Sequence, residues 1–404
     1  MQEDLPIADR RPRPFIAHAA GEEDAIPLTK AQHLDPAHAP KRILALDGGG
    51  IRGVLTLEFL EVIESLLQKR QNDQNFLLSD YFDLIGGTST GSIIAAGLAC
   101  GMPIKDIKAL YYGLGKEVFI PTGWGIVAAK FKAEPLQKAL DNALGADTTL
   151  DSDKIRTGLM VMTKRLDTGS PWPLNNGGGG RYAAQDGALR LTQVVRASTA
   201  APTYFDPEHI EISSRDGKTV EGEFVDGGVS PFNDPALQLL MLAALAGHGF
   251  HWRTGKSELL LVSVGTGSYR QPSQQPGLLD KVAGAAAGGL RALQSLMDDC
   301  ARTNQAMLQW LTDCLTPWPV DRAVGDMKLD SRSGPQLATY ARYNVLLEQA
   351  WLSSTLKVEL SPDKLAEIRK MDNPANMGRL AELGRTAAAL QVKAEHFPAA
   401  FDVR

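Results

Sequence analysis

Residues 42–53 have the sequence Arg-Ile-Leu-Ala-Leu-Asp-Gly-Gly-Gly-Ile-Arg-Gly, a short apolar run that passes directly into a glycine-rich loop. The run at 42–46 is typical of a buried parallel strand, because such a strand is covered on both faces and does not alternate with polar residues. From Val54 to about Lys69 apolar residues recur at helical spacing. This stretch therefore predicts a strand–loop–helix unit.

The same pattern returns along the chain. Residues 81–85 predict a second strand, and the apolar residues from Ser92 to Cys100 predict the helix that follows it. Further strands are expected at 158–162 and 258–264, and a buried helix at 235–245. Strands that alternate with helices indicate an α/β fold built on a largely parallel sheet.

The pattern changes at both ends of the chain. Residues 1–40 carry several prolines and little periodicity, so we expect an N-terminal extension with weak order of its own and an ordered α/β domain from Lys41 to residue 270. After residue 270 strand signals become sparse, which predicts a helical C-terminal region at 271–404, packed on that domain.

Composition excludes several classes of protein. The chain has 404 residues and a formal net charge of −5, and its Lys and Arg residues are scattered, so we expect no nucleic acid polymer as partner. Three cysteines in a chain of this length favour a reducing compartment over a disulfide framework. No signal peptide is recognisable, and no run approaches the ~18–20 apolar residues of a membrane span. We expect a cytoplasmic protein, whose contact with lipid at the inner membrane is at most peripheral.

The sequence Gly87-Thr88-Ser89-Thr90-Gly91 has the form of a nucleophile elbow. A sharp turn between a strand and a helix holds the serine Oγ clear of the backbone, and it requires small residues such as Gly87 and Gly91 on either side. Ser89 is therefore the candidate nucleophile, at a helix N-terminus that favours a developing oxyanion. The alternative is a chance match in a glycine-rich protein.

The loop from Gly48 to Gly53 precedes a helix, and its backbone N–H groups are candidates for an oxyanion hole. It also fits a loose dinucleotide-binding pattern, but such a site needs an acidic residue about 20 residues further on, at the end of a second strand. Glu61 and Glu64 fall inside the predicted helix instead. Arg52 either holds a phosphate headgroup or braces the loop through an ion pair.

The candidate base is Asp226 rather than a histidine. None of the seven histidines has a recognisable catalytic context. Asp226 follows the apolar residues Phe224 and Val225, and Gly227 and Gly228 leave room beside it. Burial against Ser89 would raise the pKa of this carboxylate and allow it to accept a proton. Taken alone, Asp226-Gly227 is also compatible with an ordinary turn.

At these residues the chain resembles the patatin-like phospholipases. That family combines an Asp-Gly-Gly-Gly-x-Arg-Gly loop, a Gly-x-Ser-x-Gly elbow and a later Asp-Gly-Gly/Ala motif, found here at 47–53, 87–91 and 226–228. Residues 197–202 and 233–235 also match, although many members carry two asparagines where this chain has Asn233-Asp234. The resemblance covers roughly residues 42–267.

The resemblance implies a three-layer α/β/α fold and a lipid acyl hydrolase of the phospholipase A type that needs no metal or other cofactor. It implies that Ser89 and Asp226 form a catalytic dyad, and that an acyl ester such as a phospholipid is the substrate. The oxyanion hole would be formed by Gly49, Gly50 and Ile51, with Arg52 nearby.

Three questions stay open from the sequence. Some bacterial members of the family are antiphage effectors that a cyclic oligonucleotide switches on, and a small nucleotide activator is one alternative here. A catalytically silent regulatory protein on the same scaffold is another, and the sequence also leaves open a homo-oligomer. The Ala/Gly/Leu-rich residues 277–297 are either a lid or membrane-facing helix, or an ordinary amphipathic core helix.

Overall fold

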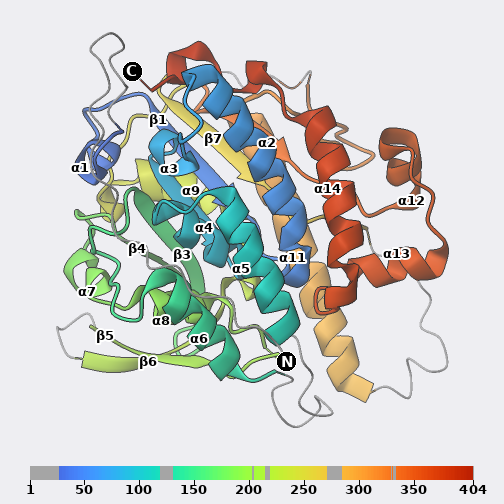
Figure 1. Cartoon of the computed structure of the whole chain (residues 1–404), viewed down its shortest axis with the longest axis horizontal. Coiled ribbons are helices and arrows are strands. Elements are labelled where there is room, and N and C mark those ends of the chain that lie inside the picture. The colour runs from blue at the N-terminus through green and yellow to red at the C-terminus, as the bar shows by residue number, and fades with distance from the viewer. Residues whose placement is uncertain are drawn as a thin grey trace, which may run out of the picture.

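A single mixed β-sheet runs through the molecule (Figure 1). The computed structural model describes residues 27–118, 131–202, 204–213, 219–270, 284–328, 330 and 334–403, without the side chains of 213 and 284–294. The sheet has nine strands in the order β5-β6-β3-β2-β1-β7-β9-β8, with β4 paired to β3 beside this path. The strands are β1 (Lys41–Leu46), β2 (Leu84–Thr88), β3 (Gly158–Arg165), β4 (Pro171–Asn175), β5 (Glu208–Ser213), β6 (Thr219–Asp226), β7 (Leu259–Val264), β8 (Asp313–Cys314) and β9 (Thr339–Tyr343).

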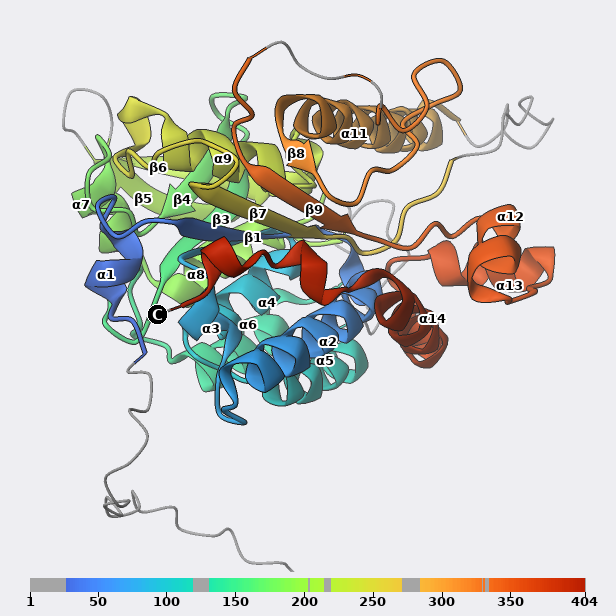
Figure 2. The same ribbon diagram turned by 90° about the horizontal axis from the view of Figure 1, so that it is seen from above.

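Helices cover both faces of the sheet, which confirms the three-layer α/β/α fold. Seen from above, α9 and α11 lie on one side of the strands, and α2, α4, α5, α6 and α14 lie on the other (Figure 2). The helices of the described residues are α1 (Lys30–Leu34), α2 (Gly53–Gln71), α3 (Leu78–Tyr81), α4 (Thr90–Ala99), α5 (Ile104–Glu117), α6 (Ala133–Leu144), α7 (Ala183–Gly187), α8 (Leu191–Ser198), α9 (Ala236–Ala244), α11 (Gly284–Leu311), α12 (Gln349–Trp351), α13 (Pro362–Arg369) and α14 (Met377–Gln391).

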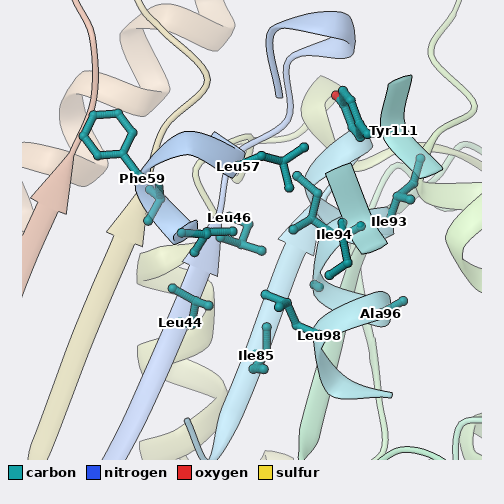
Figure 3. Packing of buried hydrophobic residues seen from close by; sticks show 14 of the residues in the cluster. Leu44, Leu46, Leu57, Phe59, Ile85, Ile93, Ile94, Ala96, Leu98 and Tyr111 are labelled. Carbon is teal, nitrogen blue, oxygen red and sulfur yellow. The ribbon is translucent and has the colours of Figure 1, made fainter. Parts of the chain in front are cut away.

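The central strand β1 shows why its sequence is apolar throughout. Leu44 and Leu46 point into the core under α2 and α4, where Figure 3 shows them near Ile85. Ile43 and Ala45 point to the opposite face, into the core under α9. Since both faces of the strand are covered, alternation with polar residues is lost.

The parallel strands β1, β2, β3 and β7 lie close to the predicted positions, and β2 requires one correction. The sequence analysis placed the second strand at 81–85, whereas residues 78–81 form α3 and the strand runs from Leu84 to Thr88. The strand includes the Gly86-Gly87 pair. Glycine is needed at position 86 because α9 packs closely on the strand: a Cβ at Gly86 would lie 2.6 Å from Cδ2 of Leu239. The antiparallel strands β4 and β5 were not predicted.

The C-terminal region is largely helical, as predicted, but it also completes the sheet. Strand β9 pairs in parallel with β7 over Leu260–Val264, and β8 pairs with β9. Helix α14 packs on α2 so closely that a Cβ at Gly384 would lie 3.1 Å from Cα of Leu55. The sheet thus crosses the boundary expected at residue 270, and residues beyond it share one core with the strands before it.

Order also begins earlier than Lys41, which corrects the predicted start. Within the described part of the N-terminal extension, α1 places His33 against the sheet, where its ring nitrogen Nδ1 lies 2.9 Å from Oδ1 of Asp83. Lys41 donates to the carbonyl oxygens of Gln32 and His33. These contacts attach the segment to β1. Among the described residues, no helix combines the length and the apolar character needed to cross a bilayer.

We expect that a chain ending at residue 270 does not fold cooperatively. Removal of β9 would turn the buried strand β7 into an exposed edge, and removal of α14 would uncover the apolar side of α2. Thermal unfolding followed by circular dichroism checks this expectation. A sharp transition within a few degrees of that of the full chain would contradict it.

Candidate active site

Ser89 lies at the sharp turn between β2 and α4. Its backbone has φ 53° and ψ −129°, a left-handed φ that non-glycine residues seldom adopt. The turn is closed by two glycines: a Cβ at Gly87 would lie 2.2 Å from the carbonyl oxygen of Gly91, and one at Gly91 would lie 2.4 Å from that of Leu46. The predicted elbow is therefore present, and larger residues at 87 and 91 are sterically excluded.

Asp226 ends strand β6 and lies beside Ser89. Ser89 and Asp226 line the same cavity, and the N–H of Gly228 donates to Oδ1 of Asp226 at 2.7 Å. Burial raises the pKa of Asp226 to about 6, although the neighbouring Ser89 hydroxyl and the Gly228 amide act against the rise. A Cβ at Gly227 would lie 2.3 Å from the carbonyl oxygen of Met162, so this close approach to β3 requires glycine. The structure thus brings together two side chains that are far apart in the sequence.

Ser198 supports the elbow from the neighbouring helix α8. The backbone N–H of Ser89 donates to Ser198 Oγ at 2.9 Å, and this hydroxyl donates to the carbonyl oxygen of Met162 at 2.6 Å. Ser198 is completely buried. The sequence analysis included it only within the matching stretch 197–202, because one buried serine has no signal of its own. It links the turn at Ser89 to strand β3.

The glycine-rich loop lies over the same site. Some of the backbone amides predicted as oxyanion donors have no hydrogen-bond acceptor within the described part of the chain, and one already has an acceptor. The amides of Gly49 and Gly50 have no acceptor among the described residues, and both glycines line the cavity that contains Ser89. The N–H of Ile51, in contrast, donates to the carbonyl oxygen of Met371 at 2.8 Å. Ile51 is therefore a correction: its amide is already occupied, which leaves Gly49 and Gly50 as the available donors of the loop.

Arg52 is the second correction at this loop. Its side chain is buried, its Nε has no hydrogen-bond partner among the described residues, and its guanidinium lies 6.0 Å from the ring centroid of Tyr269. Burial lowers the pKa of Arg52 below its ordinary value. The described lining of the cavity does not include Arg52. Asp47, the carboxylate directly before the loop, pairs with Arg342 instead, and Arg52 forms no salt bridge among the described residues.

An apolar cavity opens next to Ser89 and Asp226. About 1110 Å³ of space lies between its walls, including space open to solvent. Aliphatic and aromatic side chains supply most of the wall: Ile93, Tyr111, Leu114, Val118, Leu136, Tyr204, Phe205, Val229, Met297 and Met371. Tyr111 also donates a hydrogen bond from its hydroxyl to the carbonyl oxygen of Gly50. None of the described histidines lines this cavity.

The expected lid at 277–297 lies mostly outside what the structure describes. Residues 277–283 are outside the described residues, and helix α11 is described from Gly284, with side chains from 295 onward. Met297 is one described side chain of this segment that reaches the cavity wall. The lid therefore stays a prediction.

A buried ion cluster lies below the glycine-rich loop, and the sequence analysis did not find it. Arg342, on strand β9, donates from Nη1 and Nη2 to the two carboxylate oxygens of Asp47, at 2.7 and 2.6 Å. Its Nη1 also lies 3.2 Å from Oδ2 of Asp234. Burial raises the pKa of Asp47 to about 7, and the Arg342 guanidinium works against that rise. Residues 47, 234 and 342 have no common sequence pattern, so only the fold places them together.

Comparison with known proteins gives a consistent result. Residues 44–240 match the family model described as patatin-like phospholipase. A cGAMP-activated phospholipase from Escherichia coli (strain TW11681) is 33% identical over 206 residues, which are 49% of this chain and 55% of that protein. Patatin-15 from Solanum tuberosum is 31% identical over 238 residues, 56% of this chain and 60% of the relative.

A third relative carries the description of a probable inactive protein. A probable inactive patatin-3-Kuras 1 from Solanum tuberosum is 28% identical over 237 residues, 56% of this chain and 62% of the relative. The alignments thus span between 55% and 62% of the length of these three curated relatives.

The raised pKa of Asp226 predicts the pH dependence of Ser89 reactivity. Above about pH 6 the carboxylate is ionised and accepts the serine proton, and below that pH it is protonated and cannot. The rate at which a fluorophosphonate labels Ser89 should therefore fall as pH decreases through about 6. Labelling is followed by intact-protein mass spectrometry between pH 5 and 8, with folding verified by circular dichroism at each pH. A rate that is constant over this range would contradict the assignment of the base.

Proposed function

Because residues 44–240 belong to the patatin-like phospholipase family, we propose that this protein is a lipid acyl hydrolase that cleaves acyl esters of membrane phospholipids. One observation carries the proposal: Ser89, at a strained elbow, and the buried carboxylate of Asp226 line one apolar cavity. A nucleophile and its base are present together with a place for a fatty acyl chain. These are the parts that acyl transfer requires.

The proposed reaction has two steps. Ser89 Oγ attacks the ester carbonyl while Asp226 accepts the hydroxyl proton, and the amides of Gly49 and Gly50 stabilise the negative oxygen of the tetrahedral intermediate. The carbon–oxygen bond to the leaving group then breaks, Asp226 returns the proton to the leaving alcohol or lysolipid, and an acyl-enzyme remains. Asp226 then takes a proton from water, which attacks the acyl-enzyme ester; as the bond to Ser89 Oγ breaks, Asp226 returns the proton to Oγ and the fatty acid is released.

The wall of the cavity favours a long acyl chain over a small polar ester. Ile93, Leu114 and Leu136 are nearly or fully buried side chains of three different helices, and they surround the space beside Ser89. Removal of a fatty acyl chain from water gains about 0.8 kcal/mol per buried methylene group. The substrate class is therefore a lipid, reached by peripheral contact of a cytoplasmic protein with the inner membrane.

Control by a small nucleotide is the second candidate function, as in an effector that a cyclic oligonucleotide switches on. The similarity to a cGAMP-activated phospholipase supports it. Liposome hydrolysis measured with and without a panel of cyclic di- and trinucleotides tests this idea. An increase of at least tenfold with one of them supports gating. Equal rates throughout indicate a constitutive enzyme, and inertness on every ester indicates a silent protein.

We expect Ser89→Ala and Asp226→Asn each to reduce hydrolysis of a p-nitrophenyl acyl ester by on the order of 10⁴-fold, because each removes one member of the dyad. Asp186→Asn is the matched control: burial raises the pKa of Asp186 to about 7, but this carboxyl does not line the described cavity. It should retain wild-type activity. Turnover is measured on folded protein, verified by circular dichroism.

Full activity in Ser89→Ala or Asp226→Asn would refute the dyad. Mass spectrometry of lipids released from membranes by the wild type, and not by Ser89→Ala, identifies the substrate headgroup and the acyl position.

A further inference from the structure

We propose that Arg342 is a positioning residue for the proposed reaction: from strand β9, it fixes the glycine-rich loop relative to the loop that follows Asp226. Residue 342 lies outside the segment 44–240 that matches the family model. The inference rests on the proposed function, because it concerns how the donors at Gly49 and Gly50 are held over Ser89.

Arg342 makes contacts on both sides of the site. Its two terminal nitrogens bind Asp47, the residue directly before the glycine-rich loop, in a two-pronged contact. The same guanidinium contacts Asp234, eight residues after Asp226, and donates to Ser263 Oγ at 2.6 Å. All these side chains are at least nine-tenths buried, so water does not compete for the bonds.

The residues next to Asp47 and Asp234 are hydrogen-bonded to each other, and this closes a ring of contacts. The N–H of Gly48, next to Asp47, donates to the carbonyl oxygen of Asn233 at 3.1 Å. The carbonyl oxygen of Gly48 in turn accepts from Asn233 Nδ2 at 3.3 Å. Asn233 precedes Asp234, so the ring runs from Arg342 through Asp47, Gly48, Asn233 and Asp234 back to Arg342.

The ring is also tied to the elbow. Thr88, the residue before Ser89, donates from its hydroxyl to the carbonyl oxygen of Phe232 at 2.7 Å. The segment 232–234 therefore holds the nucleophile on one side and the glycine-rich loop on the other. A change in the position of Asp47 moves Gly49 and Gly50, because only Gly48 separates them from the anchored carboxylate.

The guanidinium is specifically suited to this position. Its planar fork binds both oxygens of Asp47 and reaches Asp234 with the same Nη1, whereas a lysine ammonium is a point charge and cannot match this geometry. Displacement of an oxyanion donor weakens transition-state binding more than substrate binding. Replacement of Arg342 should therefore reduce kcat and leave KM nearly unchanged.

A matched control exists at the opposite end of β1. Arg42 is buried and donates to Asp83 from Nε at 2.9 Å and from Nη2 at 3.2 Å. It lies at the N-terminal end of the strand, whereas Asp47 directly follows its C-terminal end. Arg42→Lys removes the same kind of two-pronged contact far from the cavity, and should change stability without changing kcat per folded site.

The test compares Arg342→Lys, Arg342→Gln and Arg42→Lys in the full chain. Active sites are counted by the end point of fluorophosphonate labelling, and kcat and KM for a p-nitrophenyl acyl ester are expressed per labelled site. We expect kcat to fall by roughly 10- to 100-fold in Arg342→Lys and further in Arg342→Gln, with KM within about twofold of wild type. If Arg342→Gln does not fold, the kcat per labelled site of Arg342→Lys alone decides whether Arg342 is a positioning residue.

The outcomes separate the two proposals. Wild-type kcat per site in Arg342→Lys, with fewer labelled sites, would mean that Arg342 serves stability alone and would overturn the inference while the proposed function stands. An equal fall of kcat in Arg42→Lys would also overturn it. A wild-type protein that hydrolyses no ester would refute the proposed function, and this inference with it.

Discussion

The close approach of helix α4 to the end of strand β1 is the contact on which the site depends. Gly91 packs against the carbonyl oxygens of Leu46 and Asp47 at distances that no Cβ permits. This contact brings the first turn of α4 to the start of the glycine-rich loop. Ser89, whose backbone is left-handed, then lines one cavity together with Gly49, Gly50 and Asp226. Strain at a nucleophile of this kind persists because the packing around it permits no other arrangement.

The architecture explains why three separated segments meet there. Strands β1, β2 and β7 are parallel, so their carboxyl ends lie at one edge of the sheet, and the loops that follow them converge. Strand β6 is antiparallel to β3, yet its last residue, Asp226, pairs with Thr163 near the carboxyl end of β3. The edge therefore collects the candidate nucleophile, the candidate base and the candidate amide donors, and α4, α5 and α6 supply part of the apolar cavity.

Burial gives the polar groups at this edge their properties. Asp226 and Asp47 both have pKa values raised by burial, but their environments differ. Asp226 accepts a hydrogen bond from the Gly228 amide and has no cationic neighbour among the described residues, so its proton affinity suits a candidate base. Asp47 is held by Arg342, which favours its ionised form and gives it a supporting role. Asp234 is the second carboxylate that contacts Arg342.

The sequence by itself determined the central parallel strands, the elbow at Ser89, the glycine-rich loop and the candidate base Asp226. These features depend on local constraints: covered strands are continuously apolar, and tight turns require glycine at fixed spacing. Only the tertiary structure decided that the amide of Ile51 is occupied by Met371, that the Arg52 guanidinium lies over the ring of Tyr269, and that β9 completes the sheet. Each of these is a contact between residues that are at least 75 positions apart in the sequence. Such contacts follow from packing, and a local pattern of residue types does not encode them.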